Sequence, residues 1–83
     1  MHRQYNTAEN ILTAVNAMAR TIYESRGYKT TDNHPFYPIG RLNYHPQEEQ
    51  SWWAAVSCFE IATGIDAMDA FSELEDELIE RFG

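Results

Sequence analysis

The chain has 83 residues, of which 43% are apolar and 13% aromatic, and its formal net charge is −7. This composition excludes an intrinsically disordered chain, and no apolar run reaches the roughly 20 residues that a membrane span needs. A single cysteine, Cys58, excludes an intrachain disulfide and a zinc site built on several cysteines.

The length predicts a single domain, residues 1–83, whose small core leaves roughly 3–5 kcal/mol of net stability. Self-association would add to that stability, so we expect a homodimer or a higher oligomer. Residues 1–5 lack the apolar segment of a signal peptide, which predicts a cytoplasmic protein.

The first predicted element is a helix over residues 7–26. Asn6 precedes it and Glu9 follows three residues later, which is the spacing of a capping box, and Gly27 stands where a left-handed residue ends a helix. Apolar residues recur at steps of three and four, which is typical of one buried helix face. The central row is Ala8, Ile11, Val15, Met18 and Ile22, widened by Leu12, Ala19 and Tyr23.

A long connection, residues 27–45, follows the first helix. Pro35, Pro38 and Gly40 prevent a regular helix here, and about 20 residues is long for a link between two helices. The segment 39–44 could form a short extended stretch, but no partner strand is visible. The apolar residues of this connection predict an ordered loop that packs across the helices: Tyr28, Phe36, Tyr37, Ile39, Leu42 and Tyr44.

Two further helices are predicted over residues 46–63 and 66–82. Pro46 suits the first position of a helix, and Gly64 followed by Asp66 indicates a break with a new cap. With a change of direction at Gly64, both groups of apolar residues can reach one core. The first group is Trp52, Val56 and Phe59, the second is Ile61, Ile65 and Met68, and the last helix adds Phe71, Leu74, Leu78 and Phe82.

Charge is distributed unevenly along the chain. Residues 1–46 carry a net charge of +2, whereas residues 47–83 carry ten acidic side chains and one basic side chain. Six carboxylates at steps of three and four share one face of the last helix: Asp66, Asp69, Glu73, Asp76, Glu77 and Glu80. This face is either a solvated surface that keeps the protein soluble or a contact surface for a basic partner. With only six Lys and Arg, direct binding to nucleic acid is disfavoured.

The adjacent tryptophans form a second candidate surface. Neighbouring helical residues point about 100° apart, so Trp52 and Trp53 cannot both occupy the centre of one narrow stripe. Either both flank a wide core, or Trp53 is exposed and anchors an interface. Tyr37 and Tyr44 of the loop are further candidates for contact with a partner, because aromatic side chains are enriched in interfaces.

Catalytic signals are weak. His34 and His45 lack the helical spacing that presents two metal ligands together, and Cys58 lies in an apolar turn where a buried, inert thiol is expected. The sequence therefore predicts no metal, no cofactor and no catalytic residue.

The run from Glu73 to Asp76 reads E-x-x-D, which resembles the second acidic motif of the all-α nucleotide pyrophosphatases that bind magnesium on a helical bundle. The resemblance implies a magnesium-dependent nucleotide hydrolase of reduced form. It covers four residues, and the first motif of that family, E-x-x-E on an earlier helix, has no match.

Together these patterns predict a small all-α domain of three helices: a helical hairpin, a third angled helix, and an ordered aromatic and proline-rich loop between the first two. We expect a non-catalytic partner-binding protein. It would be an inhibitor or regulator, of the acidic kind that viruses and mobile elements encode. It would cover a basic surface of its target, such as one that binds nucleic acid. The alternatives are the reduced hydrolase and a structural or oligomerisation module.

Overall fold

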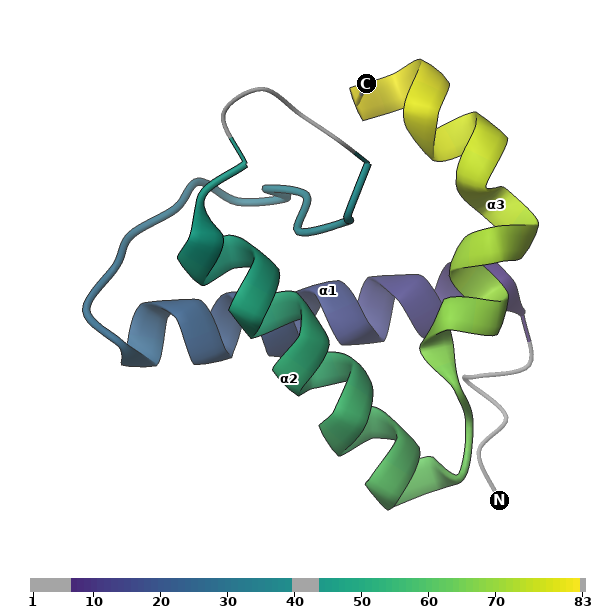
Figure 1. The fold of residues 1–83 in the computed structure, drawn as a ribbon, viewed down its shortest axis with the longest axis horizontal. Coiled ribbons are helices and arrows are strands. Elements are labelled where there is room, and N and C mark those ends of the chain that lie inside the picture. The colour runs from purple at the N-terminus through teal and green to yellow at the C-terminus, as the bar shows by residue number, and fades with distance from the viewer. Residues whose placement is uncertain (1–6, 40–43, 83) are drawn as a thin grey trace.

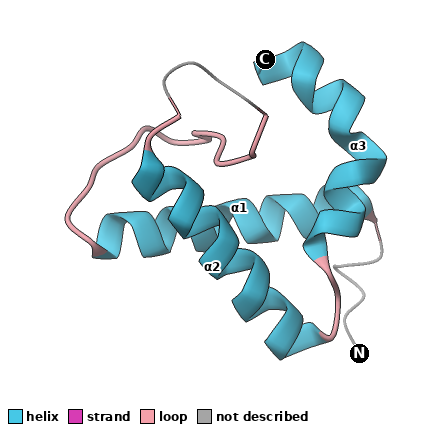
Figure 2. Ribbon diagram, viewed as in Figure 1, coloured by secondary structure: helices cyan, strands magenta, loops and turns pink. Residues whose placement is uncertain are grey.

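The computed structural model describes residues 7–39 and 44–82 (Figure 1). This part of the chain contains the helices α1 (Ala8–Ser25), α2 (Pro46–Thr63) and α3 (Ala67–Phe82), and no strand (Figure 2). The predicted all-α fold is confirmed. Both α2 and α3 pack against α1, whereas α2 and α3 contact each other little. None of the described helices has the length and apolar character needed to cross a membrane.

The helix starts depend on local caps. Thr7 lies in the extended region, and its Oγ1 accepts a hydrogen bond from the Asn10 N–H at 3.1 Å. The prediction that Asn6 caps α1 together with Glu9 is therefore wrong by one residue, and Asn6 lies outside the described residues. Asp66 caps α3 as predicted, because its Oδ1 accepts from the Met68 N–H at 2.9 Å.

The start of α2 combines an expected residue with an unexpected one. Pro46 occupies the first helical position, as its missing N–H predicts. The cap itself is His45, whose Nδ1 accepts a hydrogen bond from the Gln47 N–H at 3.1 Å. Histidine is an uncommon cap, so this role of His45 could not be predicted from the residue type.

Two glycines end the first two helices. Gly27 follows α1 with φ 93°, and Gly64 follows α2 with φ 77°, a left-handed conformation that disfavours other residues. The Gly64 N–H donates to the Glu60 carbonyl at 2.7 Å, which closes the last turn of α2. The predicted break near Gly64 is confirmed, and it lets α3 pack back on α1.

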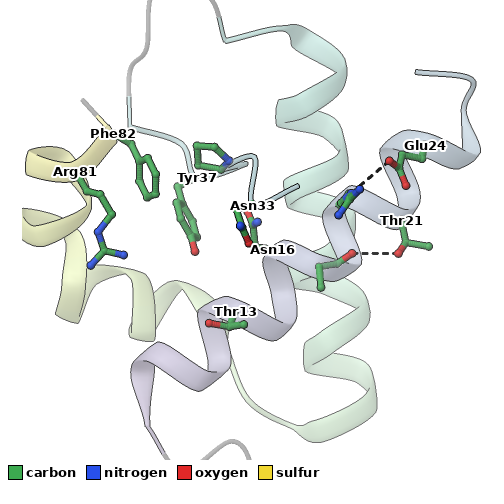
Figure 3. Close-up of a pocket in the computed structure, with 11 residues that line it drawn as sticks. Thr13, Asn16, Thr21, Glu24, Asn33, Tyr37, Arg81 and Phe82 are labelled. Carbon is green, nitrogen blue, oxygen red and sulfur yellow. Dashed lines mark hydrogen bonds and ion pairs between the residues drawn. The ribbon is translucent and has the colours of Figure 1, made fainter. Parts of the chain in front are cut away.

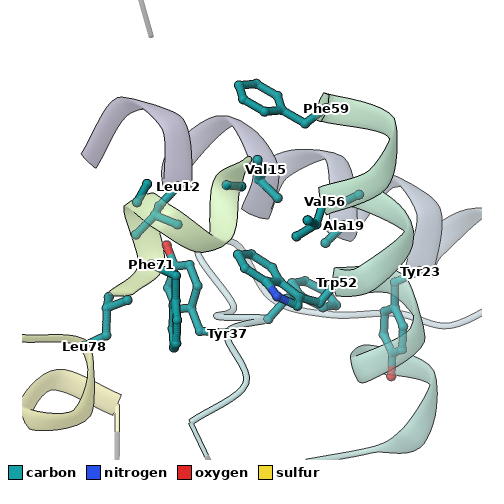
Figure 4. Close-up of a cluster of buried hydrophobic side chains, with 14 residues drawn as sticks. Leu12, Val15, Ala19, Tyr23, Tyr37, Trp52, Val56, Phe59, Phe71 and Leu78 are labelled. Carbon is teal, nitrogen blue, oxygen red and sulfur yellow. The ribbon is translucent and has the colours of Figure 1, made fainter. Parts of the chain in front are cut away.

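The core differs from the predicted pattern in which row of α1 is central (Figure 4). Leu12, Val15, Ala19 and Tyr23 are buried, whereas Ala8, Ile11, Met18 and Ile22 are only half-buried beside them. The predicted residues Trp52, Val56, Phe59, Phe71 and Leu78 are buried.

One core prediction is wrong. Ile61 is 86% exposed, because α2 turns this position away from α1 while Trp52 and Phe59 face the core. Ile65 and Met68 lie beyond the break at Gly64, and both pack at the edge of the core as expected. The change of helix direction at Gly64 therefore brings Ile65 and Met68 against the core, whereas Ile61, which precedes the break, stays exposed.

The loop after α1 enters the core, as predicted for an ordered aromatic loop. Phe36 is 0% exposed and Tyr37 9% exposed. The Tyr37 ring meets Trp52 edge-on with 5.4 Å between ring centroids, and Phe36 meets Tyr23 at the same distance. The extended stretch predicted over 39–44 falls largely on residues 40–43, which lie outside the described residues.

Asn16 of α1 fixes the backbone of this loop. Its Oδ1 accepts from the Phe36 N–H at 2.8 Å, and its Nδ2 donates to the His34 carbonyl at 2.9 Å. Two further contacts hold the same segment: His34 Nε2 lies 2.7 Å from Glu48 Oε1, and the Tyr44 hydroxyl donates to the Phe36 carbonyl at 2.7 Å. The side chain of Asn16 thus gives the loop backbone the hydrogen bonds that a neighbouring strand would otherwise provide.

The first prediction tests this attachment. Asn16→Ala leaves a part-buried N–H and carbonyl without partners, so we expect the free energy of unfolding to fall by about 1–3 kcal/mol. Asn10→Ala, on the exposed side of the same helix, is the matched control, and we expect a change within about 0.5 kcal/mol. Urea denaturation of the two variants measures the difference. Equal stabilities would show that the Asn16 contacts contribute nothing net.

Candidate partner-binding surfaces

The outward face of α3 carries a row of exposed carboxylates, Asp69, Glu73, Asp76 and Glu80, which we call the acidic row. The helix holds this orientation because its apolar residues, including Phe71 and Leu78, are buried on the opposite side. Residues three and four apart on a helix lie close together, so the four negative charges form one continuous strip.

No ion pair within the described residues reaches the acidic row. The ion pairs of this part of the chain join Arg20 to Glu24 and Asp32, and His34 to Glu48. The like charges within the row each disfavour α3 by roughly 0.2–0.5 kcal/mol per neighbouring pair. Within residues 7–39 and 44–82, the row therefore forms a negative surface that no ion pair compensates.

The other two carboxylates predicted for this face have different surroundings. Asp66 caps the first turn of α3, so its carboxylate already accepts a hydrogen bond from the chain. Glu77 lies toward α1, beside a small cavity of about 70 Å³ that Glu9 and Arg81 also line. Both remain exposed. Asp69 and Glu73 of the acidic row, together with Asp66, line a hollow of about 560 Å³ beside Thr7, Ala8 and Ile11 at the start of α1.

The structure separates the two tryptophans. Trp52 is 0% exposed and lies in the centre of the core, whereas Trp53 is 43% exposed on the outer side of α2. Tyr37 is buried between α1, α2 and α3, and Tyr44 is half-buried with its hydroxyl bound to the loop. Of the predicted aromatic contact residues, Trp53 offers the most surface to a partner.

A polar cavity of about 540 Å³ lies between α1, the loop and the end of α3 (Figure 3). Part of its polar lining is already bound within the chain. Arg20 pairs with Glu24 at 3.3 Å and with Asp32 at 2.8 Å, and the amide of Asn16 binds the loop backbone. The Thr21 hydroxyl donates to the Ala17 carbonyl. The side chains of Thr13, Asn33, Tyr37 and Arg81 also line the cavity and make no hydrogen bond with another described residue.

The residues considered for metal or nucleophilic chemistry are dispersed. His34 pairs with Glu48, His45 caps α2, and residues 7–39 and 44–82 contain no group of three His, Cys, Asp or Glu side chains placed to hold a metal. Glu73 and Asp76, the E-x-x-D pair, both point to solvent in the acidic row.

Cys58 is exposed, so the expectation of a buried thiol is wrong. The neighbouring positions Val56 and Phe59 face the core, and the helical rotation of about 100° per residue turns Cys58 outward. It lines an apolar groove together with Met18 and Ile22 of α1.

Comparison of the chain with models of known protein families, with characterised proteins and with solved structures gives no significant match.

The second prediction concerns the buried phenol of Tyr37. Burial raises the pKa of Tyr37 above its ordinary value of 10.0, the charge of Glu9 raises it further, and Arg81 opposes the shift. In the unfolded chain the phenol loses its proton first, so its contribution to stability is present below pH 10 and is lost as pH rises through the raised pKa. We expect the wild type to lose more stability than Tyr37→Phe above pH 10. Denaturation of both proteins between pH 8 and 11 measures this, and parallel profiles would contradict it.

Proposed function

We propose that this protein is a non-catalytic, acidic binding protein whose acidic row contacts a basic surface on a partner protein. The observation that carries the proposal is the uncompensated strip of four carboxylates on α3, which the described chain neither pairs nor buries. A basic partner would relieve the repulsion within the strip and gain attraction across the interface. The protein would thereby act as an inhibitor or regulator of that partner.

The spacing of the charges favours a partner whose basic surface normally holds nucleic acid. The 14 residue steps from Asp66 to Glu80 span about 21 Å of helix, so the six carboxylates predicted for this face are on average about 4.2 Å apart along the axis. One strand of DNA carries a charge about every 3.4 Å along its axis. Lysine and arginine side chains arranged along a phosphate backbone could therefore contact the carboxylates of α3 instead.

The proposal extends to the setting in which the protein acts. We place the protein in the cytoplasm, where a nucleic-acid-binding target would be accessible, and we infer that it self-associates. Two copies would present two acidic rows, and a bivalent contact can exceed the affinity of either row alone.

The third prediction tests the acidic row by charge removal. In the quadruple variant Asp69→Asn, Glu73→Gln, Asp76→Asn and Glu80→Gln, α3 loses its like-charge repulsion, so stability should rise by up to about 1 kcal/mol. Affinity for the partner should fall at least tenfold at low salt, mainly through slower association. The protein retained from a cell lysate by the immobilised wild type, and released by salt, supplies the partner for this measurement.

The matched control removes the same number of charges from other faces: Glu9, Glu49, Glu60 and Glu75, each changed to Gln. This control should bind the partner with an affinity close to that of the wild type, because the acidic row is intact. Equal association rates for the quadruple variant and the wild type at low salt would show that the row is only a solvated face.

A further inference from the structure

The cavity of about 540 Å³ between α1, the loop and the end of α3 has the size of a small-molecule site (Figure 3). Ligand sites in proteins measure about 300–1,000 Å³ and combine apolar walls with a few polar groups that orient the ligand. Pro35, Tyr37 and Phe82 provide ring surfaces in this cavity, and Thr13 and Asn33 provide polar groups. The lining therefore suits a ligand that has an apolar ring and one polar end.

Three hydrogen-bond donors lie together at one wall of the cavity. Thr13, Tyr37 and Arg81 also line the adjoining cavity of about 70 Å³, so their side chains lie close together between the two spaces. The polar atoms of these side chains make no hydrogen bond or ion pair with another described residue. Burial raises the pKa of Tyr37, so its hydroxyl keeps its proton at neutral pH and can donate it. Three donors without partners indicate an acceptor group on the ligand.

Arg81 determines the charge that this acceptor should carry. Its guanidinium lies 5.7 Å from the centre of the Phe82 ring and forms no ion pair with another described residue. The second arginine of the cavity, Arg20, is already neutralised by two carboxylates. A guanidinium has five N–H groups in a plane and can bind a carboxylate or a phosphate through two of them. The ligand should therefore carry an anionic group beside Arg81.

The acidic surroundings favour a single negative charge on the ligand. Glu9 and Glu77 line the small cavity together with Arg81, and the whole chain carries a net charge of −7. Their repulsion is proportional to the charge of the ligand, so a phosphate with nearly two charges is opposed about twice as strongly as a carboxylate. A carboxylate thus makes the contacts to Arg81 with less opposing repulsion.

We propose that this cavity is a binding site for a small aromatic carboxylate. The ring of the ligand lies against Pro35 and Phe82. Its carboxylate accepts hydrogen bonds from the guanidinium of Arg81 and from the hydroxyls of Tyr37 and Thr13. No residue of the acidic row lines this cavity, so the site goes beyond the proposed function and does not depend on it.

The experiment compares two probes, phenylacetate and phenylacetamide, which have nearly the same shape and differ in charge. Each is titrated into the wild type, and binding is followed by the NMR chemical shifts of backbone amides. The shifts should concentrate at the cavity residues of α1, the loop and the end of α3. The dissociation constant should be about tenfold lower, or less, for phenylacetate, because hydrogen bonds to a charged group are the stronger ones.

Two results of these titrations would overturn the proposal. One is an equal dissociation constant for phenylacetate and phenylacetamide, and the other is the absence of shifts at the cavity residues with phenylacetate at millimolar concentration. Phenyl phosphate is a third probe and should bind more weakly than phenylacetate. Tighter binding of phenyl phosphate would overturn the choice of a carboxylate.

Substitutions test the assigned contacts. Arg81→Gln should raise the dissociation constant of phenylacetate about tenfold or more and change that of phenylacetamide little, which shows that the cavity is intact. Arg26→Gln is the matched control: it removes the same charge from an exposed position outside the cavity and should change neither constant. Wild-type affinity for phenylacetate in Arg81→Gln would overturn the proposal.

Two further variants should shift the affinity in opposite directions. Tyr37→Phe keeps the buried ring and removes one donor, so the dissociation constant of phenylacetate should rise about two- to tenfold. Glu77→Gln removes a negative charge near Arg81, so the constant should fall. An unchanged constant in both variants would place the carboxylate away from this wall and overturn the assigned contacts. Binding by the acidic row is measured separately, with the quadruple variant.

Discussion

The structure depends on the insertion of Phe36 and Tyr37 between the helices. Both α2 and α3 pack on α1 but contact each other little. Tyr37 lies between them and makes ring contacts to Trp52 of α2 and to Phe71 and Phe82 of α3. The loop between α1 and α2 therefore contributes Phe36 and Tyr37 to the core in addition to connecting the two helices. Its backbone stays in place because Asn16 supplies hydrogen bonds that a neighbouring strand would otherwise provide.

Because aromatic contacts form the core, most charged side chains of the described residues take no part in ion pairs that stabilise the fold. Within the described residues the ion pairs involve Arg20 and His34, and none reaches the acidic row of α3. Burial of aromatic rings stabilises the fold by an amount that does not depend on salt, whereas the row is screened over about 8–10 Å at physiological ionic strength. Removing charge from α3 should thus affect binding and stability in opposite directions. The proposed function requires this result: charge removal from α3 should weaken binding without weakening the fold.

Much of the fold was predictable because helix periodicity and glycine stops are local signals, as Gly27, Gly64 and Asp66 illustrate. The errors arose where rotation about a helix axis decides the outcome. The exposure of Ile61 and Cys58, which was predicted wrongly, depends on which side of α2 meets α1. The same rotation decides between Trp52 and Trp53, a choice that the sequence pattern left open. The role of Asn16 was missed for another reason: its partners are backbone groups 18 and 20 residues away, and no sequence spacing encodes such a contact.

The proposed self-association would change how the acidic row meets a target. A small core gives little net stability, and contact with a second copy would add to it. A basic target long enough to reach the acidic rows of both copies would then bind two sites, and the second contact would form at a high effective concentration. Loss of self-association should therefore weaken binding to an extended basic surface while leaving the affinity of a single acidic row unchanged.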